Sequence, residues 1–324
     1  MLKHSFNSAL APYIEGFLEY KHSLGYSYVS QETKLKNLDR FWLEENGNPA
    51  LLTRENLLGW SAKRETESTC ARGDRLSVVR QLSLYMNGIG VDAYIPTDRC
   101  TASHPVIHVL SPEEVLEFIS VVDNYNPPES HRRFSRLANE YRIVFRLLLS
   151  TGMRRSEAVS IKIEDVDLSA KNIRIYGAKN YKDRVVFIPT DMANLMAEYL
   201  GYLNHVSDDA VYWLFPSLDI TKPMPAGTLT DHFRQFWRMT SFAGTLEKDP
   251  TVHSLRHTYV VMKMNQWMKE GVDLKVMMPY LSKQLGHKST NETFYYYHQV
   301  KEAFDIIRQK DTMAARVIPE ARIR

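Results

Sequence analysis

A short segment without helical periodicity divides this chain of 324 residues into two parts. Residues 94–108 contain Pro96 and Pro105, and this pattern is typical of an interdomain linker. Before the segment, apolar residues recur only at helical spacing, and after it helical and strand-like segments are mixed. A chain of this length has room for two domains. The expected divisions are a helical domain, a linker, a second domain and a C-terminal tail, at residues 1–98, 99–108, 109–300 and 301–324.

The first part is expected to be entirely helical. Apolar residues follow a 3.6-residue period in four segments, which begin near residues 10, 30, 54 and 74. Thr53 precedes the third segment, where a capping residue is preferred. Four amphipathic helices with short connections predict a compact bundle. Its arginines, among them Arg72, Arg75 and Arg80, either contact phosphates or form a solvated helix face.

The second part adds a β-hairpin to a helical framework. Ser111 followed by Glu114 three residues later has the pattern of a capping box at a helix start. Residues 172–176 and 184–189 alternate apolar and polar side chains on either side of a polar turn, which predicts two antiparallel strands. The fold class is therefore mainly α with a small antiparallel β-sheet.

Composition restricts the function only weakly. The net charge of +3 permits DNA binding without arguing for it. No apolar run reaches 18 residues and the N-terminus lacks a signal-peptide pattern, so we expect a cytoplasmic protein with no membrane partner. The two cysteines, Cys70 and Cys100, fit neither a disulfide framework nor a metal cage.

Arg154 is the first candidate for a functional side chain. Gly152 ends one helical segment and another starts at once, so Arg154 lies at a helix junction where its guanidinium can point into a cleft. Glu157, three residues later, lies on the same face and can hold Arg154 by a charge-assisted hydrogen bond. The alternative is an exposed ion pair of little consequence.

A second candidate group begins at His253. Arg256 lies three positions later on the same helical face, so both side chains can donate hydrogen bonds to one bound oxyanion. His257 lies four positions from His253, which is a spacing typical of two metal ligands. However, no glutamate follows His253, and no carboxylate lies close enough in the sequence to serve as a third ligand. A metal site built on His253, His257, His287 and His298 remains an alternative.

Residues 285–298 form the third candidate group. They combine an imidazole, a glycine and a cluster of phenols within about four helical turns. A phenol is a poor nucleophile at neutral pH because its pKa is about 10, so a reactive tyrosine needs cationic or donor groups around its target. Tyr295, Tyr296 and Tyr297 would point about 100° apart on a helix, so at most one can face that target. A buried aromatic helix edge is the other interpretation.

These groups, in this order, closely resemble the tyrosine recombinase (phage integrase) family. Arg154 with Glu157 matches the first arginine box of the family, and His253 to Arg256 matches its His-x-x-Arg box. The family's Leu-Gly-His element appears at residues 285–287. With two further elements, these motifs span residues 151–298.

The remaining two elements of the resemblance concern a lysine and the nucleophile. The family's lysine box corresponds to residues 179–184, where Lys179 is the choice by alignment from Arg184 and Lys182 is the alternative. The family's nucleophile falls nine residues after its Leu-Gly-His histidine, at Tyr296. The segment between Arg256 and His287 is longer than is usual in the family. In this respect the chain resembles a transposon-associated subgroup.

The resemblance implies a site-specific DNA recombinase or integrase that cleaves and rejoins DNA through a 3′-phosphotyrosine and a Holliday junction. It implies that guanidiniums and imidazoles bind the phosphate, that a lysine protonates the departing 5′-oxygen, and that neither a metal nor another cofactor is needed. The implied catalytic residues are Arg154, Lys179, His253, Arg256, His287 and Tyr296, with Glu157 in a supporting role.

The resemblance also implies the architecture and the partners. The helical N-terminal half would be the core DNA-binding domain, and the second domain would be the α+β catalytic domain. The implied partners are double-stranded DNA with specific recombination sites, three further copies of the chain in a homotetramer, and accessory recombination proteins. The tail at 301–324 would dock on a neighbouring protomer, and the enzyme would associate with the nucleoid of a prokaryote when bound to DNA.

Two other functions fit some of the same residues. A type IB topoisomerase-like or telomere-resolving strand transferase would use similar side chains on one duplex. A metal-dependent hydrolase built on the histidines would lose activity with a chelator, so activity in EDTA separates it from the recombinase.

Overall fold

The computed structural model describes two compact units of the chain, Met1–Pro105 and Val106–Arg324. The described residues are 6–97, 108–127, 132–176, 183–206, 211–287 and 289–297, with side chains for all of them except 132–135, 206 and 295–297. Several predictions lie outside these residues. They concern Lys179, Lys182, His298 and the tail helix at 301–324, together with the phenol of Tyr296.

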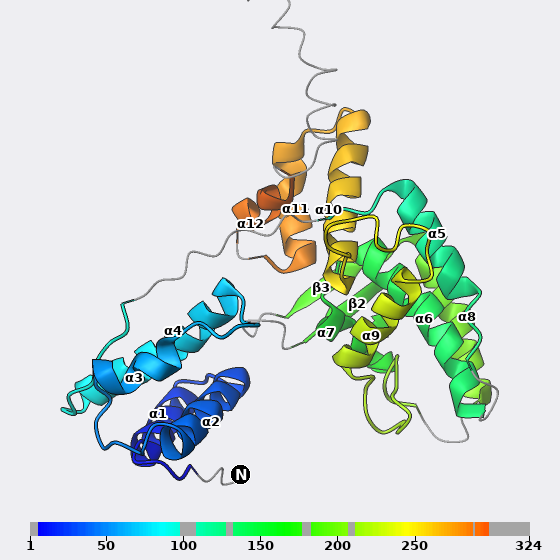
Figure 1. The fold of residues 1–324 in the computed structure, drawn as a ribbon. Helices are drawn as coiled ribbons and strands as arrows, with labels where there is room; N and C mark the ends of the chain where they lie inside the picture. Colours follow the sequence, from blue (N-terminus) through cyan, green and yellow to red (C-terminus); the bar gives the residue numbers. More distant parts are fainter. Residues whose placement is uncertain are drawn as a thin grey trace, which may run out of the picture. The chain divides into compact units, whose positions relative to one another are not determined.

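The first unit is a bundle of four helices within residues 6–97, as the apolar periodicity predicts (Figure 1). The helices are α1 (Ala11–Ser23), α2 (Val29–Glu44), α3 (Arg54–Ser61) and α4 (Thr69–Gly88). Thr53 caps α3 by accepting the N–H of Asn56 at 3.2 Å. Apolar side chains from all four helices form one core, which includes Ile14, Trp42 and Leu82.

Helix α4 begins about one turn before the position that the periodicity predicts. Ser68 caps it by accepting the N–H of Ala71 at 3.1 Å. The first turns bury a polar group instead of an apolar one, which is why the apolar period starts late. Arg75 is only 6% exposed, donates to Glu67 at 2.6 Å and lies over the Trp60 ring. Arg75 is therefore neither a solvated side chain nor an accessible phosphate ligand.

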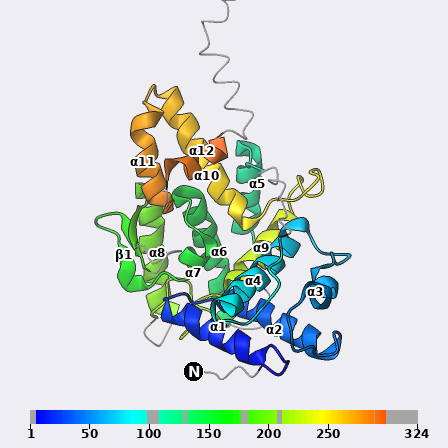
Figure 2. The same ribbon diagram turned by 90° about the vertical axis from the view of Figure 1, so that its left-hand side faces the viewer.

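The second unit surrounds a small sheet with helices, and Figures 1 and 2 show α10, α11 and α12 together at one end of it. Its first helices are α5 (Pro112–Asp123), α6 (Arg132–Thr151) and α7 (Arg155–Val159), followed by the 3₁₀ turn η1 (Ile163–Asp165). After the sheet come α8 (Thr190–Val206), α9 (Ala226–Trp237), α10 (Val252–Lys269), α11 (Leu274–Leu285) and α12 (Thr290–Tyr297).

The sheet has the order β1-β2-β3 and is antiparallel throughout. The predicted hairpin is confirmed as β2 (Asn172–Ile175) and β3 (Arg184–Phe187), with Ile173 opposite Val186. The two-residue strand β1 (Val166–Asp167) was too short for an alternating pattern to predict. The fold class, mainly α with a small antiparallel sheet, is confirmed.

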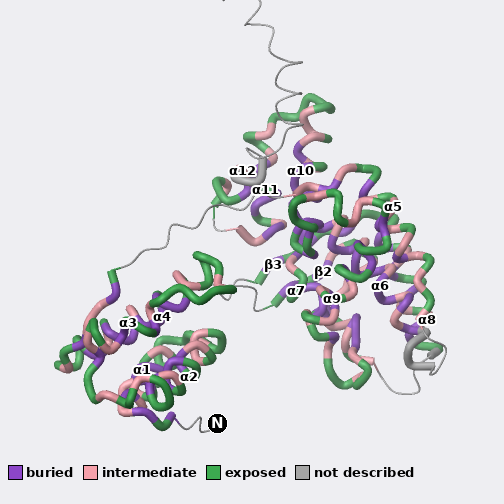
Figure 3. Tube along the Cα trace, viewed as in Figure 1, coloured by how far each residue is buried: buried purple, intermediate pink, exposed green. Residues whose placement is uncertain are grey.

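Helix α6 runs through the main core of the second unit, and buried residues recur along the part of the helix whose side chains are described (Figure 3). The predicted capping box at the start of α5 is confirmed, because Ser111 Oγ accepts the N–H of Glu114 and the Glu114 carboxylate accepts the N–H of Ser111. Helices α10, α11 and α12 share a smaller core around Tyr259 and Leu281. Among the helices that the structure describes, none is long and apolar enough to cross a membrane.

Candidate active site

The turn between α6 and α7 brings Arg154 close to α10 and α11. Gly152 has a φ of +64°, which favours glycine, and a Cβ at this position would overlap the side chains of Tyr259 and Leu285. The carbonyl of Gly152 accepts a hydrogen bond from Arg256 Nη1 at 2.7 Å. Glycine therefore permits both the sharp end of α6 and the close approach of the two helices that complete the site.

One buried carboxylate, that of Glu157, holds two arginines. Arg154 Nη1 donates to Oε1 at 2.8 Å, while the two terminal nitrogens of Arg184 donate to Oε1 and Oε2 at 2.9 and 2.7 Å. Burial alone would raise the pKa of Glu157, but hydrogen bonds from Arg184, its charge and hydrogen bonds from Arg154 outweigh burial and lower the pKa to about 2. The carboxylate is therefore ionised at pH 7, and the predicted Arg154–Glu157 pair is confirmed.

Arg184 belongs to this cluster although the sequence reasoning did not place it there. It begins β3 opposite Ile175, on the buried face of the sheet, and is 9% exposed. Its Nε donates to the carbonyl of Gln284 in α11 at 2.9 Å. The alternation along the strand could have predicted this, because Arg184 lies two positions before the buried Val186 and therefore on the same face of the sheet. A buried arginine needs an anionic partner.

Arg256 is held rigidly on the first turns of α10. Its side chain is 2% exposed, and Nη2 donates both to the carbonyl of Leu285 at 2.9 Å and to His287 Nε2 at 2.7 Å. With the bond to Gly152, these contacts fix the plane of the guanidinium. The residue therefore enters any reaction already oriented.

His287 follows the end of α11 directly. Gly286 ends that helix with a φ of +68°, and its carbonyl accepts a hydrogen bond from Arg154 Nη2 at 3.4 Å. Burial, followed by the charges of the neighbouring arginines with Arg256 first among them, lowers the pKa of His287 to about 3. The imidazole is therefore neutral at pH 7 in the protein without DNA.

His253 and His257 lie one turn apart at the start of α10, with ring centroids 4.5 Å apart and nearly perpendicular. Desolvation, followed by the charges of Arg256 and Arg154, lowers the pKa of His253 to about 4. The residue nevertheless remains partly accessible to solvent. The same arginines thus surround His253 and His287. Within the described ranges, no three His, Cys, Asp or Glu side chains form a group that could hold a metal ion.

The structure thus brings Arg154, Glu157, Arg256 and His287 together and places His253 among the same charges. Tyr296 lies on α12, whose backbone is described and which packs on α10 and α11. The segment with Lys179 and Lys182 connects β2 to β3.

Arg154, Arg184 and Arg256, with Glu157 and His287, are called the arginine cluster below. A pocket of about 610 Å³ opens beside this cluster. Arg154 lines it from the position before α7 and Glu157 from α7 itself. Arg174 lines it from β2, and Tyr176 from the position after that strand. Tyr176 is the last described residue before the lysine segment. The pocket therefore lies between the arginine cluster and the point where the lysine segment begins.

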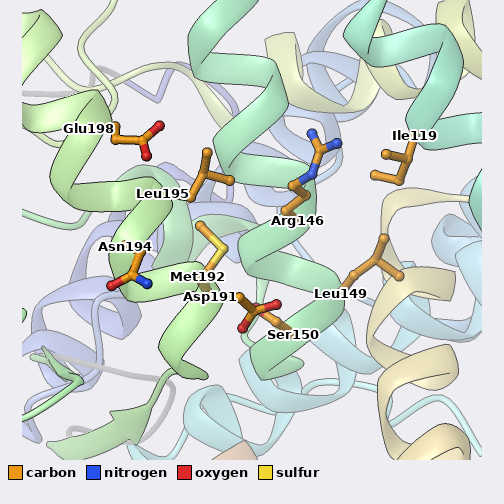
Figure 4. A pocket seen from close by; sticks show the side chains of 9 residues that line it. All are labelled: Ile119, Arg146, Leu149, Ser150, Asp191, Met192, Asn194, Leu195 and Glu198. Atoms are coloured by element: carbon orange, nitrogen blue, oxygen red, sulfur yellow. The ribbon is translucent and has the colours of Figure 1, made fainter.

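A second pocket, of about 600 Å³, lies between α5, α6 and α8 (Figure 4). Ile119 lines it from α5, Arg146 from α6 and Glu198 from α8. Arg146 is paired with Asp123 at 2.7 Å. None of the residues that line this pocket belongs to the arginine cluster, so it is separate from the candidate active site.

Comparison with known proteins agrees with the geometry. Residues 108–303 match the model of the phage integrase family. A putative integrase/recombinase, y4rB of Sinorhizobium fredii, is 24% identical over 87% of this chain and 90% of its own length. The tyrosine recombinase XerA of Pyrococcus furiosus is 26% identical over 83% of this chain and 86% of its own.

Solved structures show the same fold. The Tn1549 transposon integrase in complex with a circular intermediate DNA aligns with a TM-score of 0.65 at 14% identity, over 92% of this chain and 98% of its own. A lambda integrase tetramer bound to a Holliday junction aligns with a TM-score of 0.60 at 15% identity, over 89% of this chain and 76% of its own. These likenesses favour neither the topoisomerase-like nor the hydrolase alternative. The match over most of the second unit shows that this chain belongs to the phage integrase family, the tyrosine recombinases.

Proposed function

We propose that this tyrosine recombinase cleaves and rejoins specific DNA sites through a 3′-phosphotyrosine at Tyr296 and a Holliday junction. The observation that supports this most directly is that Arg154 and Arg256 bond adjacent residues, since Arg154 donates to the carbonyl of Gly286 and Arg256 donates to His287. Each guanidinium is oriented by protein carbonyls or by Glu157 before any substrate arrives. Such a site is suited to an anion that gains charge during the reaction.

The scissile phosphate is the anion that we assign to this site. A phosphodiester attacked by a phenol develops extra charge on its nonbridging oxygens, and two guanidiniums can stabilise that charge by hydrogen bonding. Arg154, Arg256 and His253 are assigned to these oxygens. His287 is assigned to a nonbridging oxygen or to the positioning of the nucleophile. Glu157 acts through Arg154 and is a supporting residue.

The covalent step forms one bond and breaks one. The Tyr296 oxygen bonds to phosphorus as its proton passes to solvent water, and the bond from phosphorus to the 5′-oxygen breaks. We assign Lys179 to the protonation of that oxygen, with Lys182 as the alternative, because both precede β3 in the segment that starts beside the pocket. The phosphotyrosine retains the phosphodiester link, so a 5′-hydroxyl from another strand can reverse the step without a nucleotide cofactor.

The architecture supports the assignment of DNA as substrate. We assign the four-helix first unit to DNA binding outside the cleavage point and the second unit to catalysis. The lambda integrase structure is a tetramer on a Holliday junction and the Tn1549 structure holds a circular intermediate DNA. By analogy, we propose a homotetramer that acts on two duplexes, assisted by accessory recombination proteins, and an origin in a transposon or another mobile element.

The experiment that tests this function uses covalent trapping. The protein first selects its binding sequence from a random duplex library, and a nicked duplex carrying that sequence then lets the cleaved end diffuse away. The wild-type protein is expected to form a covalent DNA adduct in EDTA, whereas Tyr296→Phe binds the duplex and forms none. Tyr295→Phe and Tyr297→Phe are the matched controls and are expected to form the adduct. If the wild-type protein binds DNA but forms no adduct, the proposed function is wrong.

A further inference from the structure

Thr293 lies on α12 and connects the helix of the proposed nucleophile to the arginine cluster. Its side chain is completely buried. Its Oγ1 lies 2.7 Å from His287 Nδ1 and 2.8 Å from the hydroxyl of Ser282 on α11. On the other side of the imidazole, Arg256 Nη2 lies 2.7 Å from Nε2. A continuous line of hydrogen bonds therefore runs from Arg256 through His287 to Thr293 and Ser282.

The chemistry of these groups fixes the position of the imidazole proton. A guanidinium has only donors, so His287 Nε2 must accept from Arg256 and carry a lone pair. A neutral imidazole with a lone pair on Nε2 has its proton on Nδ1, and that proton points at Thr293 Oγ1. The reverse tautomer would set two N–H groups against each other at 2.7 Å.

We propose that Thr293 is a positioning residue that holds His287 in the Nδ1–H tautomer and ties the helix of Tyr296 to the arginine cluster. The inference rests on the proposed function, in which His287 and Tyr296 act on the same phosphate. Thr293 is three residues before Tyr296 on one helix, so its bond to His287 also fixes the rotation of that helix. Nε2 is then on the side of Arg256, where the proposed phosphate binds.

The same hydroxyl serves both protonation states of His287. If a bound phosphate oxygen replaces Arg256 as the partner of Nε2 and that nitrogen gains a proton, the imidazolium still donates through Nδ1, and Thr293 still accepts. Valine has nearly the shape of threonine but no acceptor. Thr293→Val therefore removes the acceptor of the Nδ1 proton, one of the two contacts that hold this tautomer, while retaining most of the packing on α10 and α11.

The test compares three variants on the nicked duplex described above. Thr293→Val is expected to form the covalent adduct about tenfold to a hundredfold more slowly, by analogy with the loss seen when the hydrogen-bond partner of a metal-bound histidine is removed. Thr293→Ser retains the hydroxyl and is expected to stay within about threefold of the wild-type rate, since its chemistry is unchanged. Thr240→Val is the matched control, because Thr240 is also buried but its hydroxyl bonds only the carbonyl of Trp237 among the contacts described.

A spectroscopic measurement gives a second readout that a purely structural role would not move. Nitrogen chemical shifts of histidine-labelled protein report which ring nitrogen carries the proton, and His287→Gln identifies the signal. The wild-type protein without DNA is expected to show a protonated Nδ1 and an unprotonated Nε2, and Thr293→Val is expected to lose this single state. The tautomer of the wild-type protein is measured independently of Thr293→Val, so this measurement tests the inference even if that variant fails to fold.

The outcomes separate the inference from the proposed function. A wild-type protein with the proton on Nε2, or a folded Thr293→Val variant that cleaves as fast as the wild type, overturns the role of Thr293 and leaves the recombinase function standing. Equal loss of cleavage in Thr293→Val and Thr293→Ser also overturns it, because the hydroxyl would then not be the cause. Failure of the wild-type protein itself to form an adduct overturns the proposed function instead.

Discussion

At the residue scale, Glu157 organises the site by satisfying two arginines from different elements. Its partner Arg154 comes from the start of α7, and its partner Arg184 comes from β3. Removing one member of a buried ionic group is costly because the remaining charges stay buried without compensation. Glu157 therefore contributes to stability as well as to the orientation of Arg154.

Glu157→Gln is expected to lower the free energy of unfolding at pH 7 by about 3 kcal/mol. The pKa of this carboxyl is about 2 in the folded protein against an ordinary value of 4.5. Such a group stabilises the fold fully above its unfolded pKa, and this contribution is lost as the pH falls through the folded value. The deficit of the variant should therefore shrink between pH 7 and pH 3, as measured by urea denaturation.

Glu164→Gln is the matched control for this prediction. Glu164 is 65% exposed in the side chain and pairs with Lys162, so its loss should change stability by less than about 1 kcal/mol at either pH. A Glu157→Gln deficit that is the same at pH 7 and pH 3 would show that the ion cluster does not carry the stability assigned to it.

Arg154→Lys is expected to retain DNA binding and to lose covalent adduct formation by at least about a hundredfold. Arg154 donates from Nη1 to Glu157 and from Nη2 to the carbonyl of Gly286, and the single ammonium of a lysine cannot reproduce both bonds of this planar fork. Rates on the nicked duplex measure the effect. Arg155→Lys, at the exposed neighbouring position, is the control, and equal rates for both variants would remove Arg154 from catalysis.

At the scale of elements, the contact of the α6–α7 turn with α10 and α11 assembles the site. Gly152 allows this contact because it combines a positive φ with the absence of a Cβ beside Tyr259. Gly286 plays the corresponding role at the end of α11, where a Cβ would come within 3.0 Å of the Arg184 guanidinium. Both glycines therefore lie where separate elements meet.

Gly152→Ala is expected to destabilise the protein by roughly 2–5 kcal/mol, from backbone strain together with overlap on Tyr259. Gly244→Ala is its matched control, because Gly244 has a φ of +72° but a Cβ there would meet no other atom within 4 Å. That variant should lose only about 1 kcal/mol. Thermal or urea unfolding measures both, and similar losses would show that the close approach at Gly152 carries no energy of its own.

Local sequence patterns predicted most of these elements, but they could not predict contacts between residues far apart in the sequence. The capping box at Ser111 and the alternation in the hairpin depend on neighbouring residues, so the sequence displays them. The start of α4 escaped because its first turns bury Arg75 instead of an apolar side chain. The role of Arg184 was not predicted, because its anionic partner Glu157 lies 27 positions earlier and no local pattern reveals the pair.

At the scale of the whole molecule, the order of motifs predicted the family, while packing alone shows how the motifs meet. Arg154 and Gly286 are 132 positions apart and Arg256 and His287 are 31 apart, yet each pair is in contact. The hydrogen bond of Thr293 to His287 could not be predicted from spacing, because it depends on the angle between α11 and α12. The first and second units each have a core of their own.

The tail supplies a prediction about assembly. Apolar residues recur at helical spacing over 300–307, and we propose that this segment docks on a neighbouring protomer. Truncation after Lys301 should retain binding to a single DNA site and abolish strand exchange between two sites. Gel-shift and exchange assays measure the two properties. Normal exchange by the truncated protein would show that the tail packs on its own domain.

The central claim is that Tyr296 becomes covalently attached to DNA beside the Arg154–Arg256 pair, and peptide mapping of the trapped adduct tests it most directly. Tyr296 lies in the same helix as Thr293, whose side chain bonds His287. After proteolysis and nuclease digestion of the wild-type adduct, mass spectrometry is expected to find the nucleotide on Tyr296 alone. A nucleotide on Tyr295 or Tyr297 would contradict the assignment of the nucleophile, and an adduct on a residue outside α12 would contradict the whole account of the site.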